Sequence, residues 1–388
     1  MQPFALDVPA LRAARDRAGR LAESPQAAAP AERARTGAAL ADEELAALFL
    51  SPHVTTESLL ALARDRRGPA NTIETFSPLY ITNECDAACR MCGMRASNDD
   101  LVRETAAAGT IEEQLAILHR RGLRAVAILT GEYRHGERRT AMLRRTAEAL
   151  RAALGRGFVH VLINVGALDE PEYDLLLGDL PRSAPGRVAP QVTMCTFQET
   201  YDPDVYARFM GADGGNPRSD FGRRLGNFDR AGDAGMWSVN PGILLGLNPD
   251  TGYEILALLA HVRHLLARDL RVYVSVPRLR RASGTAYQAG PSDDALTRLV
   301  SVLGFGVPAA RVVISTREPP EVQRRLVPVI AVLTPGSPGV APYTETGARF
   351  ELEASQFEVL DHRPIEAILD EYLAAGTAIE CYEPSARA

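Results

Sequence analysis

Short apolar runs rich in β-branched residues alternate with stretches of helical periodicity from Phe76 onward. Continuous apolarity of this kind is typical of parallel strands that helices cover on both faces. The runs predict eight strands, at residues 79–83, 125–130, 158–164, 191–197, 238–247, 271–276, 311–316 and 329–334. Helices are predicted between the strands, for example at residues 111–119, where Thr110 and Glu113 form a capping box, and at residues 140–154.

Eight strands alternating with helices predict an α/β fold, a (β/α)8 TIM-type barrel, over residues 75–388. The alternative is an open six-stranded barrel followed by a separate small domain. Residues 1–74 are predicted to form an N-terminal helical extension, with helices at 38–50 and 56–63 and with Thr55 or Thr56 capping the second. The alanine-rich stretch before about Pro30 is predicted to be a partly mobile tail.

Chemically reactive or charged residues follow the C-terminal ends of several predicted strands. Functional residues of TIM-type barrels come from these ends, because the loops there meet at one face. The residues that we expect at this face are the loop 84–93 after the first strand, Glu132 after the second, Glu199 after the fourth, Arg278 after the sixth, Arg317 after the seventh and Ser337 after the eighth.

The most specific motif is the loop after the first strand, where Cys85, Cys89 and Cys92 form a CxxxCxxC pattern. Thiolates are the usual ligands of iron–sulfur clusters, and three cysteines leave one iron of a four-iron cluster open to another ligand. A structural zinc ion needs four ligands, but Cys195 and Cys381 are isolated, without a histidine pair at matching spacing. So few cysteines in 388 residues also do not indicate a disulfide scaffold. The loop therefore predicts an iron–sulfur cluster.

The composition argues against several other classes of function. A formal net charge of −6 disfavours a nucleic-acid partner, which would require a basic face. The sequence shows no apolar run of membrane-spanning length and no export signal, so we expect a soluble, cytoplasmic protein without a membrane partner. The chain contains no lysine, which excludes a Schiff base to pyridoxal phosphate and a Walker A phosphate loop.

These features together resemble the radical S-adenosylmethionine (SAM) superfamily. The cysteine loop follows the first barrel strand, and Gly131-Glu132 resembles the GGE motif of that superfamily, with Thr130 in place of the first glycine. The segment from Gly242 to Gly246 resembles the strand that contacts the adenine. The resemblance implies two cofactors, a [4Fe–4S] cluster and SAM, whose reductive cleavage gives a 5′-deoxyadenosyl radical.

Within the superfamily, segments 198–201, 277–279, 315–318 and 356–363 resemble the aromatic amino-acid lyases. Segments 86–95 and 333–339 are most similar to the L-tryptophan lyases of thiopeptide antibiotic biosynthesis, the 3-methyl-2-indolic acid synthases. The resemblance covers about residues 75–382 and includes the C-terminal segment that biotin and thiamine synthases share. Two departures set the tyrosine lyases apart. The hydrogenase-maturation enzyme has a second cysteine triad, and the thiamine enzyme has Gly-Gly-Tyr where this chain has Ala341-Pro342-Tyr343.

The resemblance also implies roles for individual residues. The three cysteines of the loop would ligate the cluster, with Glu132 on the SAM amine, Glu199 on the ribose and Arg230 on the SAM carboxylate. The full set of expected SAM contacts is Met91, Gly131, Glu132, Glu199, Arg230, Gly242 and Leu244.

On the substrate side, Arg317 is predicted to hold a carboxylate in the plane of its guanidinium, and Arg278 is a second candidate for this role. Tyr80 and Ser337 are predicted to hydrogen-bond the polar end of the substrate. Structural alternatives remain for all four residues: ion pairs for the arginines, core packing for the tyrosine and a turn for the serine.

The expected reaction converts L-tryptophan to 3-methyl-2-indolic acid. By resemblance, the 5′-deoxyadenosyl radical takes a hydrogen atom from the amino group, the side chain fragments, and the carboxyl-derived fragment migrates to indole C2. The expected partners are L-tryptophan and an external electron donor such as a flavodoxin or ferredoxin. The alternatives are a tyrosine lyase that releases p-cresol, a sulfur-inserting enzyme like biotin synthase, and a non-catalytic module that uses the cysteine loop to hold a metal.

Overall fold

The computed structural model describes residues 2–68, 71–183, 186–211, 214–287 and 290–384. Its main sheet is parallel throughout, in the order β12-β1-β11-β10-β9-β8-β7-β4-β3-β2. The strands of this sheet are β1 (Thr72–Thr75), β2 (Ser77–Tyr80), β3 (Ala125–Leu129), β4 (His160–Asn164), β7 (Gln191–Cys195), β8 (Ser238–Asn240), β9 (Arg271–Ser275), β10 (Arg311–Ser315), β11 (Val332–Thr334) and β12 (Ala378–Glu380). A separate antiparallel pair consists of β5 (Arg182–Ser183) and β6 (Arg187–Val188).

The first strand of the barrel closes the sheet on itself. Only Phe76 separates β1 from β2; β1 pairs with β11 and β12, whereas β2 pairs with β3. One continuous segment therefore pairs near both ends of the strand order, which closes the sheet, and the TIM-type α/β barrel predicted from the sequence is confirmed. The predicted strand at 238–247 is shorter, because Pro241 has no N–H to donate to a neighbouring strand, and the residues after it make only isolated bridges.

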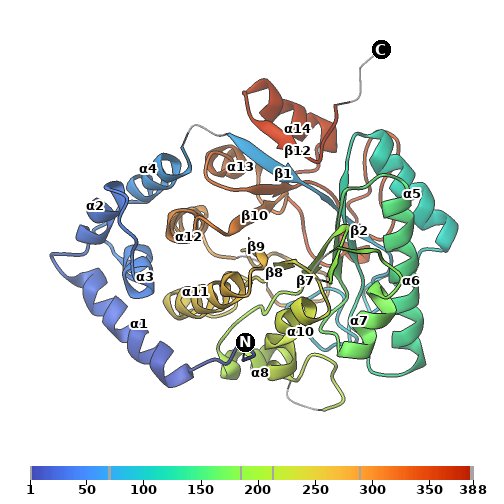
Figure 1. The fold of residues 1–388 in the computed structure, drawn as a ribbon, viewed down its shortest axis with the longest axis horizontal. Coiled ribbons are helices and arrows are strands. Elements are labelled where there is room, and N and C mark those ends of the chain that lie inside the picture. The colour runs from blue at the N-terminus through green and yellow to red at the C-terminus, as the bar shows by residue number, and fades with distance from the viewer. Residues whose placement is uncertain (1, 69–70, 184–185, 212–213, 288–289, 385–388) are drawn as a thin grey trace.

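Helices surround the sheet, with α5, α6 and α7 on one side and α11, α12 and α13 on the other (Figure 1). The predicted capping box of α5 is wrong: the helix begins at Ala108 after the N-cap Ala107, because Ala106 N–H donates to Ile81 O and fixes the path of the chain there. The helices after β2 are α5 (Ala108–Arg120), α6 (Glu137–Gly155), α7 (Glu170–Leu177), α8 (Pro203–Met210), α9 (Phe221–Leu225), α10 (Asn227–Asp233), α11 (Thr251–Ala267), α12 (Asp293–Gly306), α13 (Pro320–Leu326), the 3₁₀ turn η1 (Leu352–Ala354) and α14 (Ile365–Ala374).

Four N-terminal helices form a layer beside α11 and α12, drawn in blue in Figure 1. They are α1 (Val8–Glu23), α2 (Ala29–Arg35), α3 (Asp42–Leu50) and α4 (Thr56–Arg67). The expectation of a mobile tail is wrong for α1, whose small residues Ala18 and Ala22 are buried as the helix packs on α3 and α11. Thr55 caps α4 by accepting the Ser58 N–H, as predicted. Among the described residues, no helix combines the length and apolarity that crossing a bilayer requires.

A polar network crosses the N-terminal end of the barrel. Glu74 of β1 accepts from His160 of β4 and from the Tyr273 hydroxyl of β9, and its carboxylate lies 3.1 Å from the Arg311 guanidinium of β10. On its other ring nitrogen, His160 contacts the Thr193 hydroxyl at 2.7 Å. These side chains tie five separate strands together at the end opposite the cysteine loop.

Candidate functional site

The three cysteines of the loop after β2 face one cavity at the C-terminal end of the barrel. The cavity has a volume of about 200 Å³, and Cys85, Cys89 and Cys92 all line it. The loop is long enough to fold over the barrel mouth before α5 begins. Asp86 N–H donates to Glu132 O, and Arg90 N–H donates to Phe209 O, which fixes the loop to the segments after β3 and β7.

The surroundings of the three sulfur atoms suit thiolates that bind metal. Cys85 Sγ lies 3.4 Å from Ala87 N and 3.3 Å from Glu132 N, so two backbone N–H groups donate to it. Burial raises the pKa of Cys85 to about 11 and that of Cys89 to about 12, because a bare thiolate would be poorly solvated there. A bound iron would supply the compensating charge.

The arrangement of these thiols fits a cluster better than a single ion. Across the described parts of the chain, no three His, Cys, Asp or Glu side chains converge on one point where a single metal ion would bind. A four-iron cluster does not require such convergence, since each cysteine holds a different iron. No thiol of the loop is in a disulfide, so all three are free for this role.

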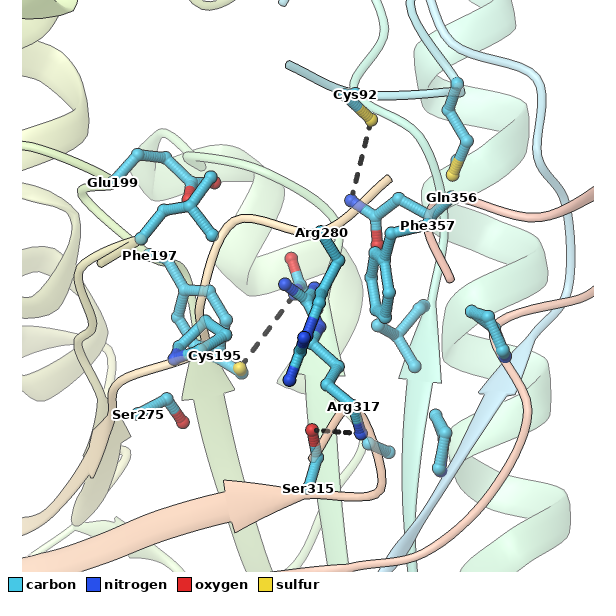
Figure 2. Close-up of a pocket in the computed structure, with 18 of the residues that line it drawn as sticks. Cys92, Cys195, Phe197, Glu199, Ser275, Arg280, Ser315, Arg317, Gln356 and Phe357 are labelled. Carbon is cyan, nitrogen blue, oxygen red and sulfur yellow. Dashed lines mark hydrogen bonds between the residues drawn. The ribbon is translucent and has the colours of Figure 1, made fainter. Parts of the chain in front are cut away.

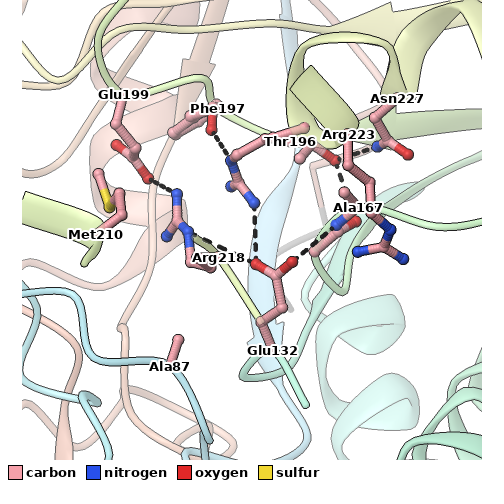
Figure 3. A network of polar contacts seen from close by, with 12 residues as sticks. Ala87, Glu132, Ala167, Thr196, Phe197, Glu199, Met210, Arg218, Arg223 and Asn227 are labelled. Atoms are coloured by element: carbon pink, nitrogen blue, oxygen red, sulfur yellow. Dashed lines mark hydrogen bonds and ion pairs between the residues drawn. The ribbon is translucent and has the colours of Figure 1, made fainter. Parts of the chain in front are cut away.

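Gly131 and Glu132 follow β3 and lie directly against the cysteine loop. A Cβ atom on Gly131 would lie 2.1 Å from Glu84 O and 2.6 Å from Cys85 Cβ, so only glycine allows this approach. The buried Glu132 carboxylate accepts from Ala167 N–H at 3.2 Å and from Arg224 Nη1 at 2.9 Å (Figure 3). A carboxylate held beside the cysteines is well placed to accept hydrogen bonds from a ligand amine.

Two arginines that the sequence did not single out complete this side of the cavity. Arg218 donates to Glu199 Oε1 at 3.0 Å, and its Nε lies 3.6 Å from Glu132 Oε2 without a hydrogen-bond partner among the described residues (Figure 3). Arg224 bridges Glu132 and the Phe197 carbonyl. Their only signal in the sequence is that both follow the fourth barrel strand. Carboxylates and guanidiniums thus alternate beside the cysteines, a pattern that suits a zwitterionic amino acid.

Arg317 lies at the other end of the same cavity. Its guanidinium lies over the Phe357 ring, 3.2 Å from the centroid, and Ser315 Oγ accepts from its backbone N–H (Figure 2). Within the described residues, no carboxylate forms an ion pair with it, and its one side-chain hydrogen bond goes to the Arg278 carbonyl at 3.4 Å. Burial lowers the pKa of Arg317 to about 10, so the group remains a cation at neutral pH. An unpaired buried guanidinium facing a cavity is a receptor for a carboxylate.

Tyr80, Met91, Glu199 and Leu244 also line the cavity, as the sequence analysis expected of site residues. Glu199 is held in a left-handed backbone conformation with φ of 69°, which directs its side chain toward Arg218. These placements bring the predicted cofactor and substrate residues to one face of the barrel, in keeping with the C-terminal ends from which they come.

Four predicted site residues lie outside the cavity lining. Arg278 is fully buried and binds Glu318, with a further contact of 2.7 Å to Asp293, which is the ion-pair alternative left open for it. The Ser337 hydroxyl donates to the Arg349 carbonyl in a turn between Gly336 and Pro338, both of which do line the cavity.

The other two residues outside the lining, Arg230 and Gly242, are ones that the sequence analysis expected to contact SAM. Arg230 points away from the cavity and donates to backbone carbonyls, at 2.7 Å to Leu168 O. Gly242 packs behind the lining, where a Cβ atom would lie 2.5 Å from Ser275 O and 2.8 Å from the Phe197 ring. Its contribution is therefore to let the strands approach, while Leu244 reaches the cavity.

Known structures share this architecture. The chain superposes on an [FeFe]-hydrogenase maturase, HydG, with a TM-score of 0.80 and 28% identity, covering 96% of this chain and 80% of that one. The HydG of Carboxydothermus hydrogenoformans gives a TM-score of 0.82 at 23% identity, over 96% and 84% of the two chains. With the cysteine loop at the mouth of the barrel, these similarities define the class: the chain is a radical SAM enzyme.

A relative found by sequence similarity indicates the type of reaction within this class of enzyme. The chain is 28% identical to the 2-iminoacetate synthase of Escherichia coli (strain K12) over 372 residues, which covers 92% of this chain and 91% of the relative. No protein-family model matches the chain. The enzyme is thus a radical SAM lyase that cleaves carbon–carbon bonds, with a [4Fe–4S] cluster and SAM as its cofactors.

Proposed function

We propose that the substrate is L-tryptophan and the product 3-methyl-2-indolic acid. The observation that carries an amino-acid substrate is the buried, unpaired guanidinium of Arg317, which faces the cavity that the cysteines line; the choice of tryptophan rests on the resemblance of two cavity segments to tryptophan lyases. An amino acid whose carboxylate binds there extends its side chain along walls that include Phe76, Leu129 and Phe197. The segments that resemble tryptophan lyases, 86–95 and 333–339, both contribute to the same cavity.

Different residues of the cavity would bind the cofactor and the substrate. When bound, the cluster and SAM together supply a carbon radical that removes a hydrogen atom from the substrate. Glu132, with Arg218 and Arg224 beside it, would hold the amine and carboxylate of the SAM methionine. Arg317 would hold the substrate carboxylate and keep the carboxyl-bearing fragment in the cavity while the indole is still bound. An external electron donor such as a flavodoxin or ferredoxin would deliver the electron.

The second candidate is a tyrosine lyase. It is favoured by the similarity to 2-iminoacetate synthase, which extends over most of both chains. Arg317 would serve a tyrosine carboxylate equally well, because both substrates share the same amino-acid end. The two candidates differ in the ring that the apolar part of the cavity receives and in the fate of the fragment, which would rejoin the indole in the tryptophan reaction, whereas the tyrosine reaction would release p-cresol.

The test is a direct comparison of the two amino acids. The anaerobically reconstituted enzyme is given SAM, a reductant and either L-tryptophan or L-tyrosine, and products are followed by mass spectrometry. We expect 5′-deoxyadenosine and 3-methyl-2-indolic acid from tryptophan alone. Release of p-cresol from tyrosine would instead support the second candidate, and 5′-deoxyadenosine without either product would rule out both substrates. Cys89→Ala serves as the control, because it removes a cluster ligand and should give no SAM cleavage.

A further inference from the structure

The C-terminal segment 355–357 contacts both ends of the active-site cavity. Gly93 N–H, beside the last cysteine of the loop, donates to Gln356 O at 3.0 Å. A Cβ atom on Gly93 would lie 2.8 Å from Ser355 O, so the loop and this segment are in backbone contact. The next residue, Phe357, lies beneath the Arg317 guanidinium. One short segment thus touches the cysteine loop and the proposed substrate-binding arginine.

The Gln356 side chain links a cluster ligand to Tyr80. Gln356 Nε2 lies 3.6 Å from Cys92 Sγ, and Gln356 Oε1 lies 2.5 Å from the Tyr80 hydroxyl (Figure 2 shows the contact to Cys92). The direction of both hydrogen bonds is set by chemistry. A cysteine thiolate accepts only, so the amide nitrogen must face it. Burial raises the pKa of Tyr80, so its hydroxyl stays neutral and donates to the amide oxygen.

We infer that Gln356 is a positioning residue that raises the reduction potential of the cluster. An N–H donor withdraws charge from the thiolate and favours the reduced, more negative state of the cluster. Tyr80 strengthens the donor by polarising the amide from its other end. Cys85 takes its donors from the backbone, and Cys92 also accepts from the backbone of Met94, so Gln356 is the side-chain donor that a conservative mutation can test. The inference rests on the cluster of the radical SAM class and not on the identity of the substrate.

The experiment is a redox titration of the reconstituted cluster followed by electron paramagnetic resonance, without turnover. At the potential where half of the wild-type clusters are reduced, we expect the ratio of reduced to oxidised cluster to fall about tenfold in Gln356→Leu. For a one-electron couple this corresponds to about 59 mV. In Gln356→Glu the ratio of reduced to oxidised cluster should fall further, because a carboxylate repels the thiolate. In Tyr80→Phe the ratio should fall less, because only the polarisation of the amide is lost. Gln191→Leu, whose amide contacts Tyr273 at the opposite end of the barrel, is the matched control and should not change the ratio.

Iron and sulfide content are measured on every variant. A Gln356→Leu enzyme with full cluster content and the wild-type potential would overturn the inference. If that variant fails to retain the cluster, the isosteric Gln356→Glu decides, and an unchanged potential there overturns it equally. A wild-type chain that assembles no cluster would overturn the assignment to the radical SAM class as well, so the two failures are distinguishable.

Discussion

Arg317 is the side chain whose environment most directly indicates a ligand. A buried cation without a carboxylate is costly unless a partner arrives, because the protein interior solvates charge poorly. Phe357 provides a flat face for the guanidinium and leaves its N–H groups directed at the cavity. The neighbouring Arg280 lines the same cavity but forms an ion pair at 2.7 Å with Glu318, a carboxylate that it shares with Arg278. Of these two guanidiniums, Arg317 is therefore the one available for a substrate carboxylate.

Replacing Arg317 should impair turnover while leaving the cofactors bound. Arg317→Leu is expected to lower kcat/KM about 100-fold, since two charge-assisted hydrogen bonds to a carboxylate are lost. Arg317→Lys should recover part of the loss, because an ammonium keeps the charge but not the planar fork. Cluster content and SAM binding, measured in parallel, should match the wild type. A wild-type kcat/KM in Arg317→Leu would disprove the carboxylate assignment.

The close packing of Gly131 against the cysteine loop leads to a prediction about the stability of the fold. Gly131→Ala should lower the free energy of unfolding by about 2 kcal/mol, because the new Cβ would overlap the Glu84 carbonyl and the Cys85 side chain. Gly109→Ala is the control, since nothing lies within 4 Å of its Cβ position in the first turn of α5. Chemical denaturation of both variants measures the difference. Equal stability of the two would show that the loop yields to the extra atom.

At the scale of the elements, hydrogen bonds and ion pairs between polar side chains connect the strands at both ends of the barrel. At the C-terminal end the contacts serve the cofactor and substrate. At the N-terminal end, Glu74 connects β1 with β4, β9 and β10 in a buried network. Burial alone would raise the pKa of Glu74, but the hydrogen bond from His160, the Arg311 charge and the Tyr273 hydroxyl outweigh it and hold that pKa below its usual value.

The lowered pKa of Glu74 makes stability depend on pH in a defined direction. The ionised carboxylate stabilises the folded chain above the pKa of the unfolded state, and this contribution is lost as the pH falls through the folded value. Glu74→Gln should therefore cost about 3 kcal/mol of unfolding free energy near neutral pH and clearly less in acid.

Urea denaturation at neutral and acid pH checks this prediction. Glu380→Gln is the control, because Glu380 contacts the same Arg311 at 3.1 Å but is exposed, and it should change stability by less than about 0.5 kcal/mol. A loss in Glu74→Gln that is equal at both pH values would contradict the titration of Glu74.

At the scale of the whole molecule, the N-terminal helical layer is fastened to the barrel by buried contacts. Arg298 of α12 reaches the C-terminal end of α3 and donates to the carbonyls of Leu48, Phe49, Ser51 and Val54. The last carbonyls of a helix lack partners within the helix, so one guanidinium satisfies several of them at once. Phe4, ahead of α1, stacks on His261 of α11 with 4.3 Å between ring centroids.

Arg298→Leu should accordingly weaken the docking of this layer. We expect a loss of about 3 kcal/mol in unfolding free energy, because buried carbonyls lose their donors. Limited proteolysis should then cut earlier in residues 24–55 than it does in the wild type. Arg325→Leu is the matched control: it breaks an exposed ion pair with Glu57 of α4 and should cost less than about 0.5 kcal/mol. Equal proteolysis of the two variants would show that other contacts hold the layer.

The sequence by itself determined the barrel, the cysteine loop and the class of enzyme. These features are encoded locally: an apolar run of β-branched residues forms a strand wherever helices cover it, and the spacing of Cys85, Cys89 and Cys92 belongs to one loop. The order of strands then fixes which loops meet at the C-terminal face. Glu132 and Arg317 were singled out for this reason, because each follows directly on a strand.

Only the tertiary structure decided which charged residues share the cavity and which pair elsewhere. Arg218, Arg224 and Gln356 reach the site from segments far apart in the chain, whereas Arg278 follows a strand just as Arg317 does yet is neutralised by Glu318. Neither outcome has a local signature, because the partner of a buried charge is set by barrel closure and not by neighbours in sequence. The burial of α1 has the same cause: alanines that read as low complexity become a packing face only when α3 and α11 are beside them.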